Sequence, residues 1–125
     1  MRKSNLIIIL ATSFLIMGCF NVTDFSQEDA KKQTWLYPFV DNYTILEGKY
    51  DIHNDIIKFF ISVNSYSEFI YQADSIAQFE KWETCYLSES ARVFIKNIPY
   101  MDGREDVFII KINHYKPEIV EFTIY

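Results

Sequence analysis

The chain has 125 residues, enough for one domain, and half of them are hydrophobic, with aromatic side chains making up 18% of the total. Seventeen acidic residues against 12 Lys and Arg give a net charge of −5, which argues against a basic face that binds nucleic acid or anionic lipid. Gly48 and Gly103 are the only glycines beyond residue 18, too few for a dinucleotide-binding fingerprint or a phosphate-binding P-loop.

The first 18 residues have the layout of a secretory signal peptide. Arg2 and Lys3 precede a twelve-residue, mostly aliphatic run, Leu6 to Met17, which ends at Gly18. A membrane-spanning helix needs about 20 apolar residues, so a transmembrane anchor is the weaker alternative. We therefore predict that residues 1–18 are removed.

The end of this segment, Leu15-Ile16-Met17-Gly18-Cys19, resembles the lipobox of bacterial lipoprotein precursors, although Met17 is less usual at its position than Ala, Ser or Thr. The resemblance implies cleavage between Gly18 and Cys19 and attachment of lipid to the Cys19 sulfur. It places the mature chain on the cell envelope, and Phe20 at the second mature position indicates the outer membrane, facing the periplasm, in a Gram-negative host. In other bacteria it would be the outer face of the cell membrane.

The mature chain that this cleavage would produce is more acidic than the precursor. It keeps 10 basic and all 17 acidic residues, a net charge of −7. Lipid on Cys19 would leave Cys85 alone, so no intrachain disulfide is available and the stability must come from the core. Aromatic residues, which bury large areas, supply much of that core.

The first part of the mature chain divides into a tether, an irregular segment and a hairpin. Residues 19–34 are mostly polar and predict a tether carrying at most a short helix capped by Ser26. Residues 35–40 are apolar but contain Pro38, which indicates irregular chain. Residues 43–52 and 56–63 alternate around a turn at 53–55 and predict a β-hairpin, with a helix over 55–63 as the rival interpretation.

The rest of the chain predicts one helix and three strands. Ser65 and Glu68 form a capping box before apolar residues at helical spacing, which predicts a helix over 66–82. Apolar runs at 91–96, 107–112 and 120–124, separated by turns, predict a three-stranded meander. The expected fold of residues 35–125 is one α+β domain, a single antiparallel sheet of about five strands in a ββαβββ order, with one long helix on one face.

Few residues are suited to catalysis or metal binding. His53 and His114 are far apart and are expected in surface turns, Cys85 is expected as a small buried hydrophobe, and residues 102–106 are expected as a solvated hairpin tip. We predict no catalytic, cofactor or metal site. Aromatic residues crowd the start of the domain, and they either pack in the core or form a candidate interface with a partner: Trp35, Tyr37, Phe39, Tyr43 and Tyr50.

Three classes of function remain open. The leading one is a membrane-tethered, non-enzymatic protein-interaction module of the envelope, such as an assembly factor, an inhibitor or an immunity-type protein. Its acidity favours a cationic protein partner and no nucleic acid. The second is a carrier with a pocket for a small ligand or lipid, and the third is an enzyme of unknown class.

Overall fold

The computed structural model describes residues 22–125. The predicted signal peptide, its cleavage between Gly18 and Cys19, and the lipid on Cys19 all lie outside the described residues. Within them, no helix is long and apolar enough to cross a membrane.

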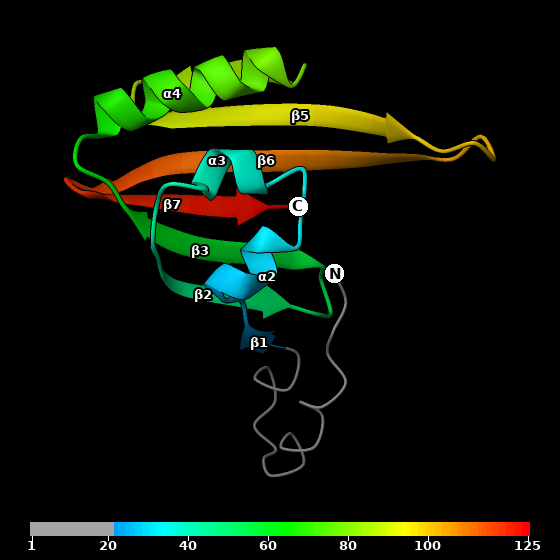
Figure 1. The fold of residues 1–125 in the computed structure, drawn as a ribbon, viewed down its shortest axis with the longest axis horizontal. Coiled ribbons are helices and arrows are strands. Elements are labelled where there is room, and N and C mark those ends of the chain that lie inside the picture. Colours follow the sequence, from blue (N-terminus) through cyan, green and yellow to red (C-terminus); the bar gives the residue numbers. More distant parts are fainter. Residues whose placement is uncertain (1–21) are drawn as a thin grey trace, which may run out of the picture.

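One antiparallel sheet of seven strands forms most of the described chain (Figure 1). Its strands lie in the order β1-β2-β3-β7-β6-β5-β4, so the central hairpin β2–β3 and the meander β4–β7 meet where β3 pairs with β7. The strands are β1 (Val22–Asp24), β2 (Ile45–Asp51), β3 (Ile56–Ser62), β4 (Glu83–Ser88), β5 (Ala91–Pro99), β6 (Glu105–Lys116) and β7 (Ile119–Ile124).

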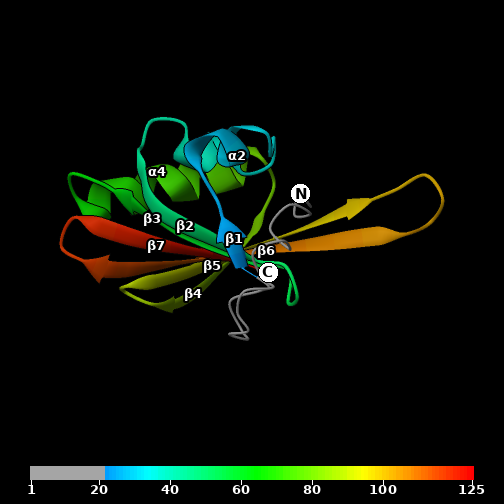
Figure 2. The same cartoon turned by 90° about the horizontal axis from the view of Figure 1, so that it is seen from below.

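The described helices all lie on one face of this sheet, which leaves its other face uncovered by helix (Figures 1 and 2). They are α2 (Gln27–Lys31), α3 (Tyr37–Val40) and α4 (Tyr66–Phe79). The Ser65 hydroxyl accepts a hydrogen bond from the Glu68 N–H at 3.3 Å and so caps the start of α4. Lys81, at φ 65°, turns the chain out of the helix, and the Trp82 N–H bonds the Ala77 carbonyl at 2.8 Å.

Aromatic rings fill the space between helices and sheet. Phe59 of β3 stacks on Phe122 of β7 with ring centroids 4.8 Å apart, and Phe69 of α4 meets Phe122 edge-on at 6.0 Å. Further along the sheet, Phe39 of α3 stacks on Phe94 of β5 at 5.5 Å. Because offset and edge-on ring pairs are favourable beyond the area that they bury, these contacts fix where the helices sit.

Gly48 lets the chain between β1 and α2 pass close over β2. A Cβ on Gly48 would lie 2.4 Å from the Phe25 carbonyl oxygen and 2.9 Å from the Phe59 Cβ. The space is instead used by a backbone bond, Phe25 N–H to Gly48 carbonyl at 3.0 Å, and by the Phe25 ring, which stacks on Phe59 at 5.5 Å.

The expected fold class was wrong in the number of strands and in the helical content. The sheet has seven strands rather than five, and three helices replace the one long helix; the helix expected over 66–82 ends at Phe79 because Lys81 turns the chain. The hairpin β2–β3 and the meander β5–β7 lie where the alternation predicted them. The missed strand β4 has all six side chains exposed, so it carries no alternation of buried and exposed residues to detect.

The described part of the segment predicted as a tether, residues 22–34, packs against the sheet. Residues 22–34 contain β1 and α2, and they bury Phe25 and Ala30 in the common core. Few apolar side chains are enough to hold a polar segment on the domain when its backbone also pairs with the edge of the sheet, as β1 pairs with β2. Residues 35–40, expected as irregular chain, hold α3, because Pro38 is tolerated in the first turn of a helix.

A largely buried ion pair ties α4 to the sheet. Arg92 of β5 donates from Nε and Nη2 to the two carboxylate oxygens of Asp74, at 2.9 and 2.7 Å, and its guanidinium lies 4.1 Å from the Tyr86 ring centroid. The Arg92 side chain is 9% exposed, and the hydrogen bonds to Asp74 raise the pKa of its guanidinium. A bidentate pair of this kind fixes one orientation of the helix over the strand.

Replacing Asp74 tests this tie. Asp74→Ala leaves the Arg92 charge buried without its counter-charge, and we expect the free energy of unfolding to fall by about 3 kcal/mol in urea denaturation. The matched control is Lys49→Ala, which removes an exposed pair with Asp24 at 2.8 Å and should change stability by less than about 0.5 kcal/mol. Similar small losses in both variants would contradict the structural role of the Arg92–Asp74 pair.

Candidate functional site

The hairpin of β5 and β6 projects beyond the rest of the sheet (Figures 1 and 2). Pairing with β4 ends at Ile95 on one side, and pairing with β7 ends at Ile110 on the other, while β5 and β6 continue to pair as far as Pro99 and Glu105. We call residues 96–108 the arm. It is a two-stranded ribbon presented away from the body of the domain.

The end of the arm is ordered by its own hydrogen bonds. The Tyr100 N–H donates to the Arg104 carbonyl at 2.8 Å, and the Gly103 N–H donates to the Tyr100 carbonyl at 3.1 Å. Gly103 has φ 93°, a conformation that side chains disfavour. Asp102 accepts from the Arg104 N–H at 3.0 Å and from its Nε at 2.7 Å, and these bonds lower the pKa of the Asp102 carboxyl, so it is ionised and accepting at neutral pH.

The Tyr100 side chain is held in place as well. Its hydroxyl donates to an Asp106 carboxylate oxygen at 2.6 Å, and the Arg104 guanidinium lies 5.0 Å from the centre of its ring. The bond to Asp106 is the main cause that raises the pKa of the Tyr100 hydroxyl. Tyr100 therefore remains a protonated donor at neutral pH, with its hydroxyl bonded to Asp106 and its ring beneath Arg104.

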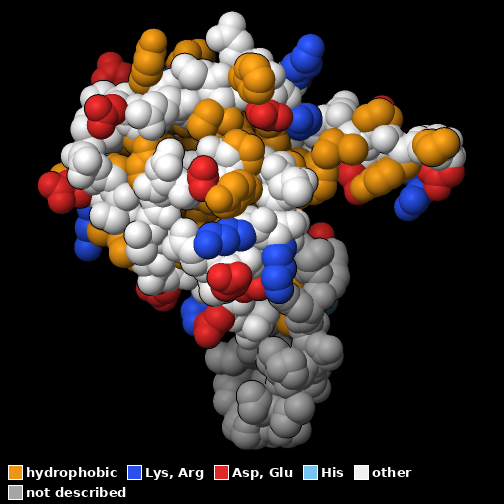
Figure 3. Space-filling view, viewed as in Figure 1, with side chains coloured by type: hydrophobic (Ala, Val, Ile, Leu, Met, Phe, Trp, Pro, Cys, Tyr) orange, Lys and Arg blue, Asp and Glu red, His pale blue; other side chains and the backbone are white. Residues whose placement is uncertain are grey.

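This ordered end displays apolar side chains to solvent. Met101 is fully exposed, and Tyr100 and Val107 are 41% and 51% exposed. The space-filling view shows hydrophobic and charged side chains together along the arm (Figure 3). Grouped apolar exposure on a monomer marks an interaction surface more often than isolated exposed residues do. We call Tyr100, Met101 and Val107 the tip.

The base of the arm is fastened to the helical layer by an aromatic stack. Trp35, just before α3, stacks on Phe108 of β6 with ring centroids 4.6 Å apart and an angle of 24° between the rings. Both residues are partly buried against the core. Trp35, a residue of the predicted candidate interface, thus packs at the base of the arm.

The other four residues of that candidate interface lie elsewhere. Phe39 and Tyr50 are buried in the core. Tyr43 is half-buried; its ring packs edge-on against Phe69 at 5.2 Å and its hydroxyl donates to Gln72. Tyr37, at the start of α3, is partly exposed, and Asp41 raises the pKa of its hydroxyl. The structure therefore does not gather these four around Trp35 as one exposed surface.

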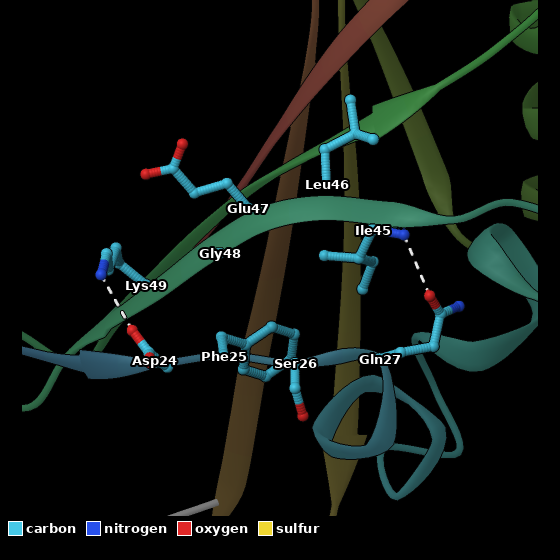
Figure 4. A pocket seen from close by; sticks show the side chains of 9 residues that line it. All are labelled: Asp24, Phe25, Ser26, Gln27, Ile45, Leu46, Glu47, Gly48 and Lys49. Carbon is cyan, nitrogen blue, oxygen red and sulfur yellow. Dashed lines mark hydrogen bonds and ion pairs between the residues drawn. The ribbon is translucent and has the colours of Figure 1, made fainter.

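A hollow of about 330 Å³ lies between β2 and the chain that links β1 to α2 (Figure 4). Its polar groups bond one another: Lys49 pairs with Asp24 at 2.8 Å, and the Ile45 N–H donates to Gln27 Oε1 at 3.0 Å. Leu46, the extra residue of a β-bulge, and Glu47 also line a second hollow of about 260 Å³. The polar groups named here are therefore bonded to one another across the first hollow.

The histidines and the cysteine are not brought into one site. His53 lies in the β2–β3 turn near the end of β7, while His114 pairs with Val120 near the beginning of β7 and stacks on the Tyr66 ring at 4.3 Å. His114 is exposed but within a strand rather than a turn. Cys85 is exposed on β4, so its expected burial was wrong. Among the described residues no group of three His, Cys, Asp or Glu side chains could hold a metal ion.

Comparisons with known proteins found no match to a family model, a curated protein or a solved structure.

Residues 102–106 were predicted as a solvated hairpin tip, and the structure places them in an exposed turn, with Gly103 at positive φ, and at the start of β6. The exposed apolar side chains beside this turn, Tyr100 and Met101, were not predicted. The available signal was Tyr100 and Met101 beside an Asp-Gly turn, a place where most hairpins carry polar residues.

Removing the Asp102 carboxylate tests whether the end of the arm is preordered. In Asp102→Ala the backbone amides of residues 100–104 should exchange hydrogen faster, because two bonds to Arg104 are lost. The free energy of global unfolding should stay nearly unchanged, because this carboxylate is outside the core. Asp24→Ala, which removes another exposed ion pair, is the control and should leave that exchange unchanged. Unaltered exchange in Asp102→Ala would show that the carboxylate does not order the turn.

Proposed function

We propose that the mature chain is a lipid-anchored protein of the bacterial envelope, a non-enzymatic module that binds a protein partner through the tip of its arm. The observation that carries the proposal is the exposure of Tyr100, Met101 and Val107 at the end of a projecting hairpin whose turn is already closed by backbone hydrogen bonds. The anchor rests on the resemblance of residues 15–19 to a lipobox.

The tip has the properties of a binding element that loses little entropy on association. Tyr and Met are enriched in the central part of protein interfaces, where a few residues contribute most of the binding free energy. Ordering a loop on binding lowers affinity, and here the turn is closed by two backbone hydrogen bonds before any partner arrives. Presentation on a ribbon away from the body lets the tip enter a recess in the partner.

Charge around the tip indicates the chemistry of that partner. Asp102, Glu105 and Asp106 surround it against one cation, Arg104, whose charge is paired with Asp102. The mature chain as a whole would carry a net charge of −7. A partner with an apolar recess and a cationic rim would therefore be steered to the tip, which fits the inhibitor and immunity-type variants of this function.

The carrier hypothesis receives less support. A carrier would enclose its ligand between helices and sheet. The region between α4 and β3–β7 is occupied by Phe59, Phe69 and Phe122, whose rings are in mutual contact. The two hollows described above lie at the β2 edge and on the surface beside it, not within this region.

Truncating the tip should abolish partner binding. We expect Tyr100→Ala/Met101→Ala to lose at least about tenfold in affinity, roughly 1.4 kcal/mol, for any protein that the tagged chain captures from envelope extracts. Tyr71→Ala, which truncates a 73%-exposed tyrosine on α4, is the matched control and should bind normally. Equal urea midpoints would show that all three chains are folded. Retention of the same captured proteins by the tip variant would refute binding through the tip.

The anchor has a separate test. Cells fed radiolabelled palmitate should yield a labelled, membrane-bound chain, and Cys19→Ala should lose the label. One acyl chain binds a membrane only marginally and two or more bind firmly, so the variant should also leave the membrane fraction. A purified chain that begins at Met1, or that carries an unmodified Cys19, would refute the anchor without affecting the tip.

A further inference from the structure

Strand β4 forms an open edge of the sheet. It pairs with β5 on one side and is the last strand in the sheet order. All six of its side chains, from Glu83 to Ser88, are exposed, including Tyr86 at 69% and Leu87 at 56%. It contains no Lys or Pro, the residues that commonly protect edges, although a bulge at Leu87 interrupts its last pair with β5. The opposite edge, β1, has three residues.

We propose that β4 pairs antiparallel with β4 of a second copy of this chain, around a twofold axis that passes by Cys85. Such an isologous contact requires a strand whose two halves complement each other. Around this axis Thr84 lies opposite Tyr86 of the second copy, a pair of good strand formers.

One ion pair, present twice by symmetry, favours a second copy in this register. Lys81 and Glu89, in the turns that flank β4, are each four residues from Cys85, so Lys81 comes to the same end of the paired strands as Glu89 of the second copy, and the pair recurs by symmetry. A shift of the register moves Lys81 away from Glu89 in both pairs. The same edge therefore supplies both the cation, Lys81, and the anion, Glu89, that a second copy needs to pair with it.

The contact should be weak in solution and stronger on a membrane. A six-residue edge buries less than the roughly 1,200 Å² of a standard stable interface. Chains held on one membrane surface meet at a much higher effective concentration than in free solution. Association in the envelope is therefore the condition in which to look for it.

Cys85 is a reporter for this geometry. In the proposed register the two Cys85 Cα atoms would lie about 4.5–5.5 Å apart, within reach of a short bismaleimide. Two differently tagged full-length chains, expressed together and treated in intact envelopes, should give a product of twice the mass that carries both tags. Cys85→Ser should abolish it. Leu46→Cys in the Cys85→Ser background moves the thiol to an exposed site on β2, five strands from β4 in the sheet order, and should give no such product.

Charge reversal tests the register. Lys81→Glu and Glu89→Lys should each lower the doubly tagged product several-fold, because each creates two like-charge pairs, and the double variant should restore it. Equal urea midpoints would exclude unfolding as the cause. Lack of the doubly tagged product, crosslinking of Cys85 to a different protein instead, or failure of the double variant to recover would each overturn the proposal. The membrane condition rests on the proposed anchor, which the palmitate label tests separately, and none of these outcomes bears on the tip.

Discussion

The stack of Phe59 on Phe122 holds the two halves of the sheet under the same helical layer. β3 and β7 belong to separate parts of the chain, the hairpin and the meander, and their rings meet 4.8 Å apart at the junction of these parts. Phe25 extends the stack towards β1, and Phe69 brings α4 over it. From there α4 extends over the β5–β4 side of the sheet, where Asp74 bonds Arg92 of β5, and the end of the β5–β6 hairpin lies beyond the helical layer (Figure 1).

The parts of this fold that could be predicted are those in which burial and sequence spacing coincide. Ile57, Phe59 and Ile61 alternate along β3 and are buried on one face, and α4 buries Phe69, Ile70, Ala73 and Ala77 at helical spacing. β1 and β4 lack this signal. β1 has three residues and β4 has no buried side chain, so both exist because a neighbouring strand offers backbone partners. A contact of this kind depends on residues far away in the sequence, which local patterns do not reveal.

Local sequence patterns also could not show which aromatic side chains are exposed at the candidate site. Aromatic identity suggested a surface formed by residues 35–50, but it does not distinguish Phe39, which is buried, from Trp35, which packs at the base of the arm. The exposure of Tyr100 and Met101 depends on how far β5 and β6 extend past β4 and β7, and the sequence contains no direct measure of that length difference. The hydrogen bond between Tyr100 and Asp106, six residues apart, becomes evident only once the turn at Gly103 is known.

The anchor, the arm and the β4 edge point in different directions, so the proposed interactions are compatible. β1 begins three residues after Cys19, a reach of at most about 10 Å, so a lipid at Cys19 would keep the β1 edge near the membrane surface. β4 lies six strand spacings away, about 29 Å, and the arm runs along the strands, perpendicular to that direction. In an antiparallel β4 pair the two arms extend to opposite sides and both tips stay accessible. The two β1 edges would lie up to about 62 Å apart. Both can reach one membrane only if the joined sheet lies along it, and this orientation points the tips sideways, towards other proteins held on the same surface.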